Sequence, residues 1–134
     1  DYPSWLNEVK LGATTVWERW NSLLPDGSIS GTGMNSLNHY AYGSIADWMY
    51  RNMVGFNPCE EAPGYKRAVI RPMPDPRIRS VDMSMDTASG LYQVGWRYDG
   101  EALAYIVTEP FDCTADLILP DGRTEKLSAG SYRF

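Results

Sequence analysis

The sequence is poor in the residue types that build metal centres and redox sites. It has two cysteines and one histidine among 134 residues. Cys59 and Cys113 lie far apart and match no metal-ligand spacing, and His39 has no cysteine or second histidine near it. We therefore expect neither a metal nor a cofactor. Buried free thiols are the preferred interpretation of the cysteines, and a disulfide stays open until their distance is known.

Long apolar runs and an excess of positive charge are also missing. No run approaches the roughly 20 apolar residues of a membrane-spanning helix. The 12 basic residues are dispersed among 17 acidic ones, for a net charge of −5. Nucleic acids and anionic membranes require clustered Lys and Arg, so we expect neither as a partner. Sugars or another polypeptide fit this charge balance better, and the compartment stays open.

The first residues show neither a signal peptide nor an initiator Met, so we expect the numbering to begin inside a longer protein. Hydrophobic residues make up 43% and charged residues 22%, as in an ordinary globular protein. A chain of this length provides one ordinary domain or two small ones.

The first part of the chain has helical periodicity in two places. A short helix is predicted over Pro3–Leu11, with Gly12 ending it. A longer one is predicted over Ser36–Val54, with Asn35 or Ser36 as its N-cap and Gly55 at its C′ position. The segment between them, residues 13–35, is broken by Pro25-Asp26-Gly27 and by glycines, which indicates an irregular loop.

The second part alternates with a period of two. Polar residues around Asn57-Pro58 and Pro63-Gly64 indicate a boundary, which divides the chain into residues 1–57, a linker over 58–64, and residues 65–134. The alternating runs after it are joined by Asp99-Gly100 and Asp121-Gly122, both strong hairpin signals. Six or seven short strands of this kind predict an antiparallel β-sandwich.

Trp17-Glu18-Arg19-Trp20 is the most unusual tetrapeptide of the sequence. Desolvation by the two indoles and the charge of Arg19 should push the pKa of a carboxylate here in opposite directions. A general base has to be ionised near neutral pH, and the neighbouring arginine would favour that form. An ion pair between Glu18 and Arg19 or a remote cation, with the tryptophans in a core, is an equally open interpretation.

His39 lies in Asn35-Ser36-Leu37-Asn38-His39-Tyr40, at the predicted start of the longer helix. Free N–H groups at a helix start, together with asparagine and tyrosine side chains, favour hydroxyl groups as ligands. The sequence thus predicts a hydroxyl-binding corner of a sugar pocket, while a half-buried structural histidine stays open. A phosphate-binding loop and a nucleophile elbow are both absent from the sequence.

The run from Glu8 to Trp20 resembles the region of bacterial α-L-rhamnosidases that closes their (α/α)6 barrel. Pro25-Asp26-Gly27-Ser28 and the run from Gly33 to Gly43 follow at the spacing of that family. Gly64-Tyr65-Lys66 and Ile70-Arg71-Pro72 extend the resemblance into a C-terminal β-sandwich. The fold that it implies is mixed: about two helices and an active-site loop from the end of the barrel, over residues 1–57, followed by the sandwich.

The resemblance implies an inverting glycoside hydrolase that removes terminal α-L-rhamnose. Glu18 corresponds to the general base that activates water, and His39 to a residue that contacts rhamnose hydroxyls. Trp17, Trp20 and Asn38 are expected to complete the substrate-binding wall. The general acid of the family lies upstream, outside this chain, so the missing N-terminal portion of the catalytic domain is an expected partner and the chain alone should be inactive.

A second hypothesis belongs to a different class of protein. The β-sandwich and exposed aromatic residues of this chain would form a non-catalytic carbohydrate-binding or accessory module. Exposed aromatic residues on the sheet would favour the module, and a concave site around Glu18 would favour the enzyme.

Overall fold

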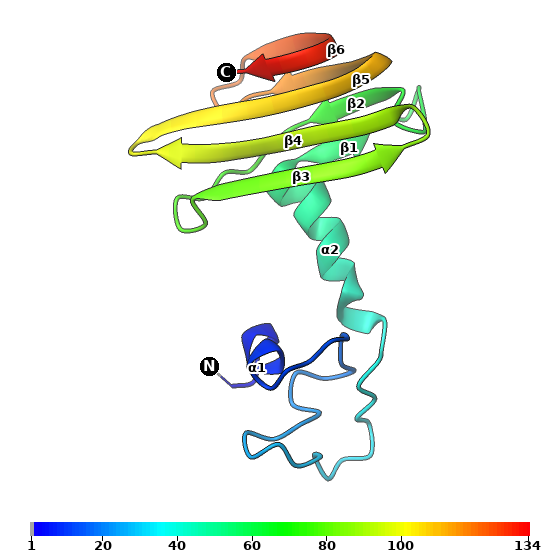
Figure 1. Ribbon diagram of the computed structural model, residues 1–134, viewed down its shortest axis with the longest axis vertical. Helices are drawn as coiled ribbons and strands as arrows, with labels where there is room; N and C mark the ends of the chain where they lie inside the picture. The colour runs from blue at the N-terminus through cyan, green and yellow to red at the C-terminus, as the bar shows by residue number, and fades with distance from the viewer. Residues whose placement is uncertain (1) are drawn as a thin grey trace. The chain divides into compact units, whose positions relative to one another are not determined.

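The computed structural model describes residues 2–134 and divides the chain into two compact units, Asp1–Asp47 and Trp48–Phe134 (Figure 1). We call them the loop unit and the sheet unit. Each has its own internal packing and is described by itself. The predicted division into residues 1–57, 58–64 and 65–134 stays a prediction.

The loop unit begins with one short helix, α1 (Trp5–Lys10). The Ser4 hydroxyl accepts a hydrogen bond from the Asn7 N–H at 3.1 Å and caps the helix start. Gly12, with φ of 81°, lies just past its end in the left-handed region. The predicted helix over Pro3–Leu11 is therefore present and slightly shorter. The described residues between Gly12 and Tyr40 form turns and irregular loop, as predicted for residues 13–35.

The second helical segment begins later than its periodicity predicts. It consists of η1 (Ala41–Ser44), α2 (Ile45–Trp48) and η2 (Met49–Val54), and Gly55 follows in the left-handed conformation with φ of 80°. The predicted helical start at Ser36 is wrong. The Ser36 hydroxyl accepts from the N–H of Asn38 at 3.3 Å, a local bond that competes with a helix start.

The sheet unit contains six strands in one hydrogen-bonded sheet. Their order is β1-β2-β5-β4-β3, and β6 pairs with β5. The strands are β1 (Phe56–Pro58), β2 (Arg67–Ile70), β3 (Ser80–Thr87), β4 (Gly90–Asp99), β5 (Ala102–Ile118) and β6 (Thr124–Arg133).

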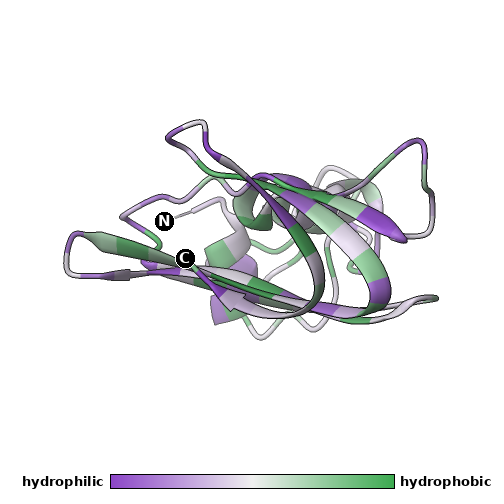
Figure 2. Cartoon of the chain, turned by 90° about the horizontal axis from the view of Figure 1, so that it is seen from above, coloured by the Kyte–Doolittle hydropathy of each residue, from purple (hydrophilic) through white to green (hydrophobic). Residues whose placement is uncertain are grey.

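Strand β5 connects the two parts of the sheet, which Figure 2 shows from above. Its first part pairs with β4, and its second part, after an irregularity between Glu109 and Thr114, pairs with β2. The predicted sandwich is confirmed, but its purely antiparallel character is wrong because β2 runs parallel to β5. The whole β3–β4 hairpin lies between them in sequence, which leaves enough chain for a parallel crossover.

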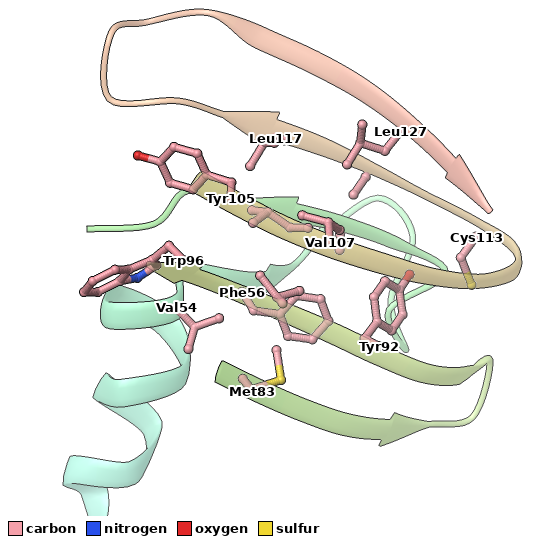
Figure 3. Packing of buried hydrophobic residues seen from close by; sticks show 14 of the residues in the cluster. Val54, Phe56, Met83, Tyr92, Trp96, Tyr105, Val107, Cys113, Leu117 and Leu127 are labelled. Carbon is pink, nitrogen blue, oxygen red and sulfur yellow. The ribbon is translucent and has the colours of Figure 1, made fainter. Parts of the chain in front are cut away.

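The core of the sheet unit lies on the apolar positions of the predicted alternation. Figure 3 shows Phe56, Tyr92 and Trp96 within it, and all three are fully buried. Two of its aromatic residues have their polar atoms satisfied: Tyr92 donates to the Tyr65 carbonyl and Trp96 to the Met53 carbonyl, each at 2.7 Å. Cys59 and Cys113 are buried free thiols, which confirms the preferred interpretation.

Glu109 is a buried ionisable side chain in the sheet unit, with 4% of its surface exposed. Among the described residues of this unit, no other polar or charged side chain is buried. Neither carboxylate oxygen has a hydrogen-bond partner within residues 2–134. Burial raises the pKa of Glu109 from 4.5 to about 7. The folded state thus holds this proton more tightly than the unfolded chain, and the stability that it provides falls as the pH rises from about 4.5 through 7.

The substitution Glu109→Gln should remove this pH dependence. The raised pKa corresponds to about 3 kcal/mol of unfolding free energy lost between pH 4.5 and 8. Urea unfolding, followed by circular dichroism of the β-sheet band, measures the unfolding free energy at both pH values. The exposed Glu101→Gln variant should keep the full loss. An undiminished loss in Glu109→Gln would show that another group titrates.

Candidate functional site

Two segments that are distant in sequence lie side by side in the loop unit. The Glu18 N–H donates to the Ser36 carbonyl at 2.9 Å, and the His39 N–H donates to the Val16 carbonyl at 2.8 Å. The Thr15 hydroxyl donates to the Leu37 carbonyl. These bonds bring the predicted base and the predicted sugar-binding histidine onto adjacent backbone segments, residues 15–18 and 36–39.

The carboxylate of Glu18 is fixed by the opposite segment. Its Oε2 atom accepts a hydrogen bond from the Ser36 N–H at 3.0 Å, and the side chain is half-buried. The preceding Trp17 is 3% exposed, so it packs inside the unit. Trp17 is thus buried while its neighbour Glu18 keeps contact with solvent.

The guanidinium group of Arg19 is directed to the loop formed by residues 30–35. It donates to the Met34 carbonyl at 2.9 Å, to Asn35 Oδ1 at 2.7 Å, and to the Ser30 and Thr32 hydroxyls. All four acceptors are neutral. The sequence left open an ion pair between Glu18 and Arg19, whereas the structure gives the arginine a role in holding this loop.

Glu8 is a residue that sequence reasoning assigned only to a helix. It is 3% exposed, and its carboxylate accepts a hydrogen bond from the Trp17 backbone N–H. Burial is the larger effect and raises the pKa of Glu8, while this hydrogen bond lowers it. The sequence signal that could have indicated the burial of Glu8 is its spacing of three residues from Trp5, which places both on the same side of α1. Glu8 supports the backbone one residue before Glu18.

His39 is half-buried and has a defined hydrogen-bond polarity. Its Nδ1 atom accepts from the Ala41 N–H at 3.2 Å, so a neutral ring carries its hydrogen on Nε2. The ring stacks on Tyr40, with centroids 5.0 Å apart. The predicted position at a helix start is wrong, because the helical segment begins at Ala41. His39 instead presents one donor from the irregular segment that precedes the helical residues.

The remaining predicted substrate-binding residues differ in exposure. Trp20 is 37% exposed and stacks on Tyr42, with centroids 5.2 Å apart, while Trp5 approaches it edge-on at 6.1 Å. Asn38 is exposed, and its backbone is held by the Ser36 hydroxyl. Trp20 and Asn38 thus keep surface available to a ligand, which the buried Trp17 lacks.

Within residues 2–134, no group of three or more His, Cys, Asp and Glu side chains is arranged to hold a metal ion. The helices in this part of the chain are all too short or too polar to cross a membrane.

Two family models match the chain one after the other. The bacterial alpha-L-rhamnosidase 6 hairpin glycosidase domain matches residues 1–53, and the bacterial alpha-L-rhamnosidase C-terminal domain matches residues 55–133.

Curated relatives and solved structures agree with these matches. An alpha-L-rhamnosidase of Alteromonas sp. is 40% identical over 89% of this chain and 13% of its own length. An alpha-L-rhamnosidase of Formosa agariphila is 38% identical over 99% of this chain and 14% of its own length. The crystal structure of an Aspergillus terreus α-L-rhamnosidase matches the whole chain with a TM-score of 0.89 at 32% identity. The crystal structure of the Streptomyces avermitilis α-L-rhamnosidase complexed with L-rhamnose also matches the whole chain, with a TM-score of 0.86 at 33% identity. The chain covers 16% and 15% of these two structures.

Proposed function

Because this chain belongs to the bacterial α-L-rhamnosidase family, we propose that the protein containing it hydrolyses terminal α-L-rhamnosides with inversion, and that Glu18 is its general base. The observation that carries the proposal is the carboxylate of Glu18, which is held by the Ser36 N–H, lies on the segment adjacent to His39, and is half-exposed. A base needs this combination of fixed orientation and access to water.

Inverting hydrolysis requires two carboxyl groups on opposite sides of the scissile bond. They lie roughly 6.5–9.5 Å apart, which leaves room for the attacking water. Glu18 takes a proton from this water while the oxygen of the water bonds to the anomeric carbon. A general acid outside this chain protonates the glycosidic oxygen as that bond breaks. The hydrogen bond from Ser36 occupies Oε2 from one side and limits the rotation of the carboxylate.

The residues around Glu18 provide for recognition of the sugar. His39 donates from Nε2 to a rhamnose hydroxyl, since its Nδ1 atom is occupied by Ala41. The exposed part of Trp20 offers an apolar surface to the C–H face of the ring, and Asn38 offers an amide to its hydroxyls. Trp17 supports the base from within the unit.

The substitution His39→Ala in the complete enzyme should weaken sugar binding more than it slows the chemical step. It removes a hydrogen-bond donor without touching the groups that transfer protons. A lost hydrogen bond to a buried partner costs about 1–3 kcal/mol, or about 5- to 150-fold in the inhibition constant of free L-rhamnose. His39→Gln, which keeps a donor, should lose less. An unchanged inhibition constant would leave His39 a structural role only.

The carbohydrate-binding module is supported by one feature of the sheet unit. A hollow of about 640 Å³ is lined in part by Tyr98, Tyr105 and Arg123. However, the Tyr105 hydroxyl is buried and Arg123 pairs with Asp121 at 2.7 Å, so few polar groups are free for a sugar. Hydrolysis of an aryl α-L-rhamnoside by the complete protein, with and without Glu18→Gln, distinguishes the two functions.

A further inference from the structure

Arg19 lies at the centre of the most extensive side-chain hydrogen-bond network described in the loop unit. Its guanidinium donates to four acceptors distributed over residues 30–35. Asn35, one of these acceptors, also donates through its own amide to the Ser30 carbonyl at 2.5 Å. Ser30 and Asn35, the two ends of the loop, are thereby bonded to each other and to Arg19.

This network ends at the group that holds the general base. Asn35 precedes Ser36, whose N–H binds the Glu18 carboxylate and whose carbonyl accepts from the Glu18 N–H. Glu18 is in turn bonded covalently to Arg19. The four residues therefore form a closed ring of contacts, in which a displacement of the loop displaces the donor that orients Glu18.

We propose that Arg19 is a positioning residue for catalysis, which sets the orientation of Glu18 through Asn35 and Ser36. The inference rests on the proposed function of Glu18 and assigns Arg19 no contact with the substrate.

The shape of the guanidinium explains why arginine suits this position. Two nitrogens of its rigid plane are used: Nε donates to the Met34 carbonyl, and one terminal nitrogen lies within hydrogen-bond distance of Ser30 Oγ and Asn35 Oδ1. A lysine ammonium is a single nitrogen and cannot replace both donor groups. The loop also contains Gly31 and Gly33, whose conformational freedom makes it costly to order without such a clamp.

The test uses the complete enzyme with Arg19→Lys and Arg19→Ala. Both variants should lower kcat for an aryl α-L-rhamnoside by about 10²-fold, the cost of a misplaced catalytic group, with little change in KM. Guanidinium chloride should restore part of the loss in Arg19→Ala, whereas equal sodium chloride should not. Arg77→Ala, which removes an 88%-exposed arginine of the sheet unit, should behave as unaltered enzyme. Near-normal kcat in both Arg19 variants would overturn the inference.

A double substitution separates positioning from general loss of structure. If Arg19 acts through Glu18, Glu18→Gln with Arg19→Lys should be about as slow as Glu18→Gln alone. Additive losses in kcat would show that Arg19 acts elsewhere and would also overturn the inference.

Hydrogen exchange gives a readout that does not depend on activity. A peptide covering residues 30–39 should exchange faster in Arg19→Ala than in unaltered enzyme, and unchanged protection would contradict the network. Failure of the proposed function looks different: Glu18→Gln would then keep its activity, whatever the Arg19 variants do.

Discussion

Residues 1–134, purified alone, are expected to release no rhamnose from any glycoside. The proposed mechanism needs an acid as well as a base, and none of the three glutamates Glu8, Glu60 and Glu61 is suited to be the acid. Glu8 is buried and bonded to the Trp17 backbone, and Glu61 accepts from the Cys59 thiol at 2.7 Å. Glu60 is exposed in the turn after β1. Under the proposed function, the chain therefore supplies the base while the acid lies outside it.

The loop unit should also be less stable than the sheet unit when the chain stands alone. Its α1 helix has six residues, and helices of this length are marginal in water without packing. Several of its apolar side chains are largely exposed: Leu6 56%, Val9 67%, Ile29 69% and Met34 62%. Apolar surface of this kind is normally covered by a partner. The sheet unit contains its own buried core and should fold more independently.

A rhamnoside hydrolysis assay on the purified chain, combined with limited proteolysis, tests both expectations. We expect no turnover, early cleavage within residues 1–47, and a resistant fragment that contains the sheet. Adding the upstream part of the catalytic domain should restore activity. Clear turnover by the chain alone, abolished by Glu18→Gln, would show that it contains an acid that the structure did not reveal.

The strands could be predicted from sequence because their signals are local. Alternation along β4 and the glycine of the Asp99-Gly100 signal fix both the face and the register of the β4–β5 hairpin, in which Asp99 pairs with Ala102 and the turn consists of residues 100–101. The parallel pairing of β2 with β5 depends on contacts between distant segments, for which a single sequence carries no direct signal. The late start of the second helix has a similar cause, because residues 36–39 form hydrogen bonds with residues 15–18 instead of continuing the helix.

The residues of the proposed site stay a prediction from sequence, and their connections could be predicted only in part. The run Trp17-Glu18-Arg19-Trp20 and His39 were recognisable from residue types and resemblance. The direction of the Arg19 side chain was not, since charge alone favours a neighbouring carboxylate while geometry favours four neutral acceptors in loop 30–35. The contact between Glu8 and the Trp17 N–H likewise depends on how α1 packs, which periodicity does not determine.

The substitution Glu18→Gln in the complete enzyme should abolish most of its turnover while the fold is kept. Glutamine has the same shape, and its amide oxygen can accept from the Ser36 N–H as the carboxylate does. What it loses is the ability to take a proton from water. A general base contributes typically about 10²–10⁴-fold to the rate, and kcat should fall by that factor.

Two controls separate loss of the base from damage to the protein. Glu60→Gln makes the same chemical change at an exposed position and should leave kcat unaltered. The thermal midpoint of Glu18→Gln should match that of the unaltered enzyme, because the hydrogen bond to Ser36 persists. A small external anion such as azide, supplied as a substitute nucleophile, should recover part of the lost turnover.

The most direct test of Glu18 as the general base is the ratio of kcat between the unaltered complete enzyme and its Glu18→Gln variant on an aryl α-L-rhamnoside. We expect kcat to fall by about 10²–10⁴-fold, with the inhibition constant of free L-rhamnose nearly unchanged. A near-normal kcat in a folded Glu18→Gln enzyme would contradict it and would require the base to be sought outside this chain.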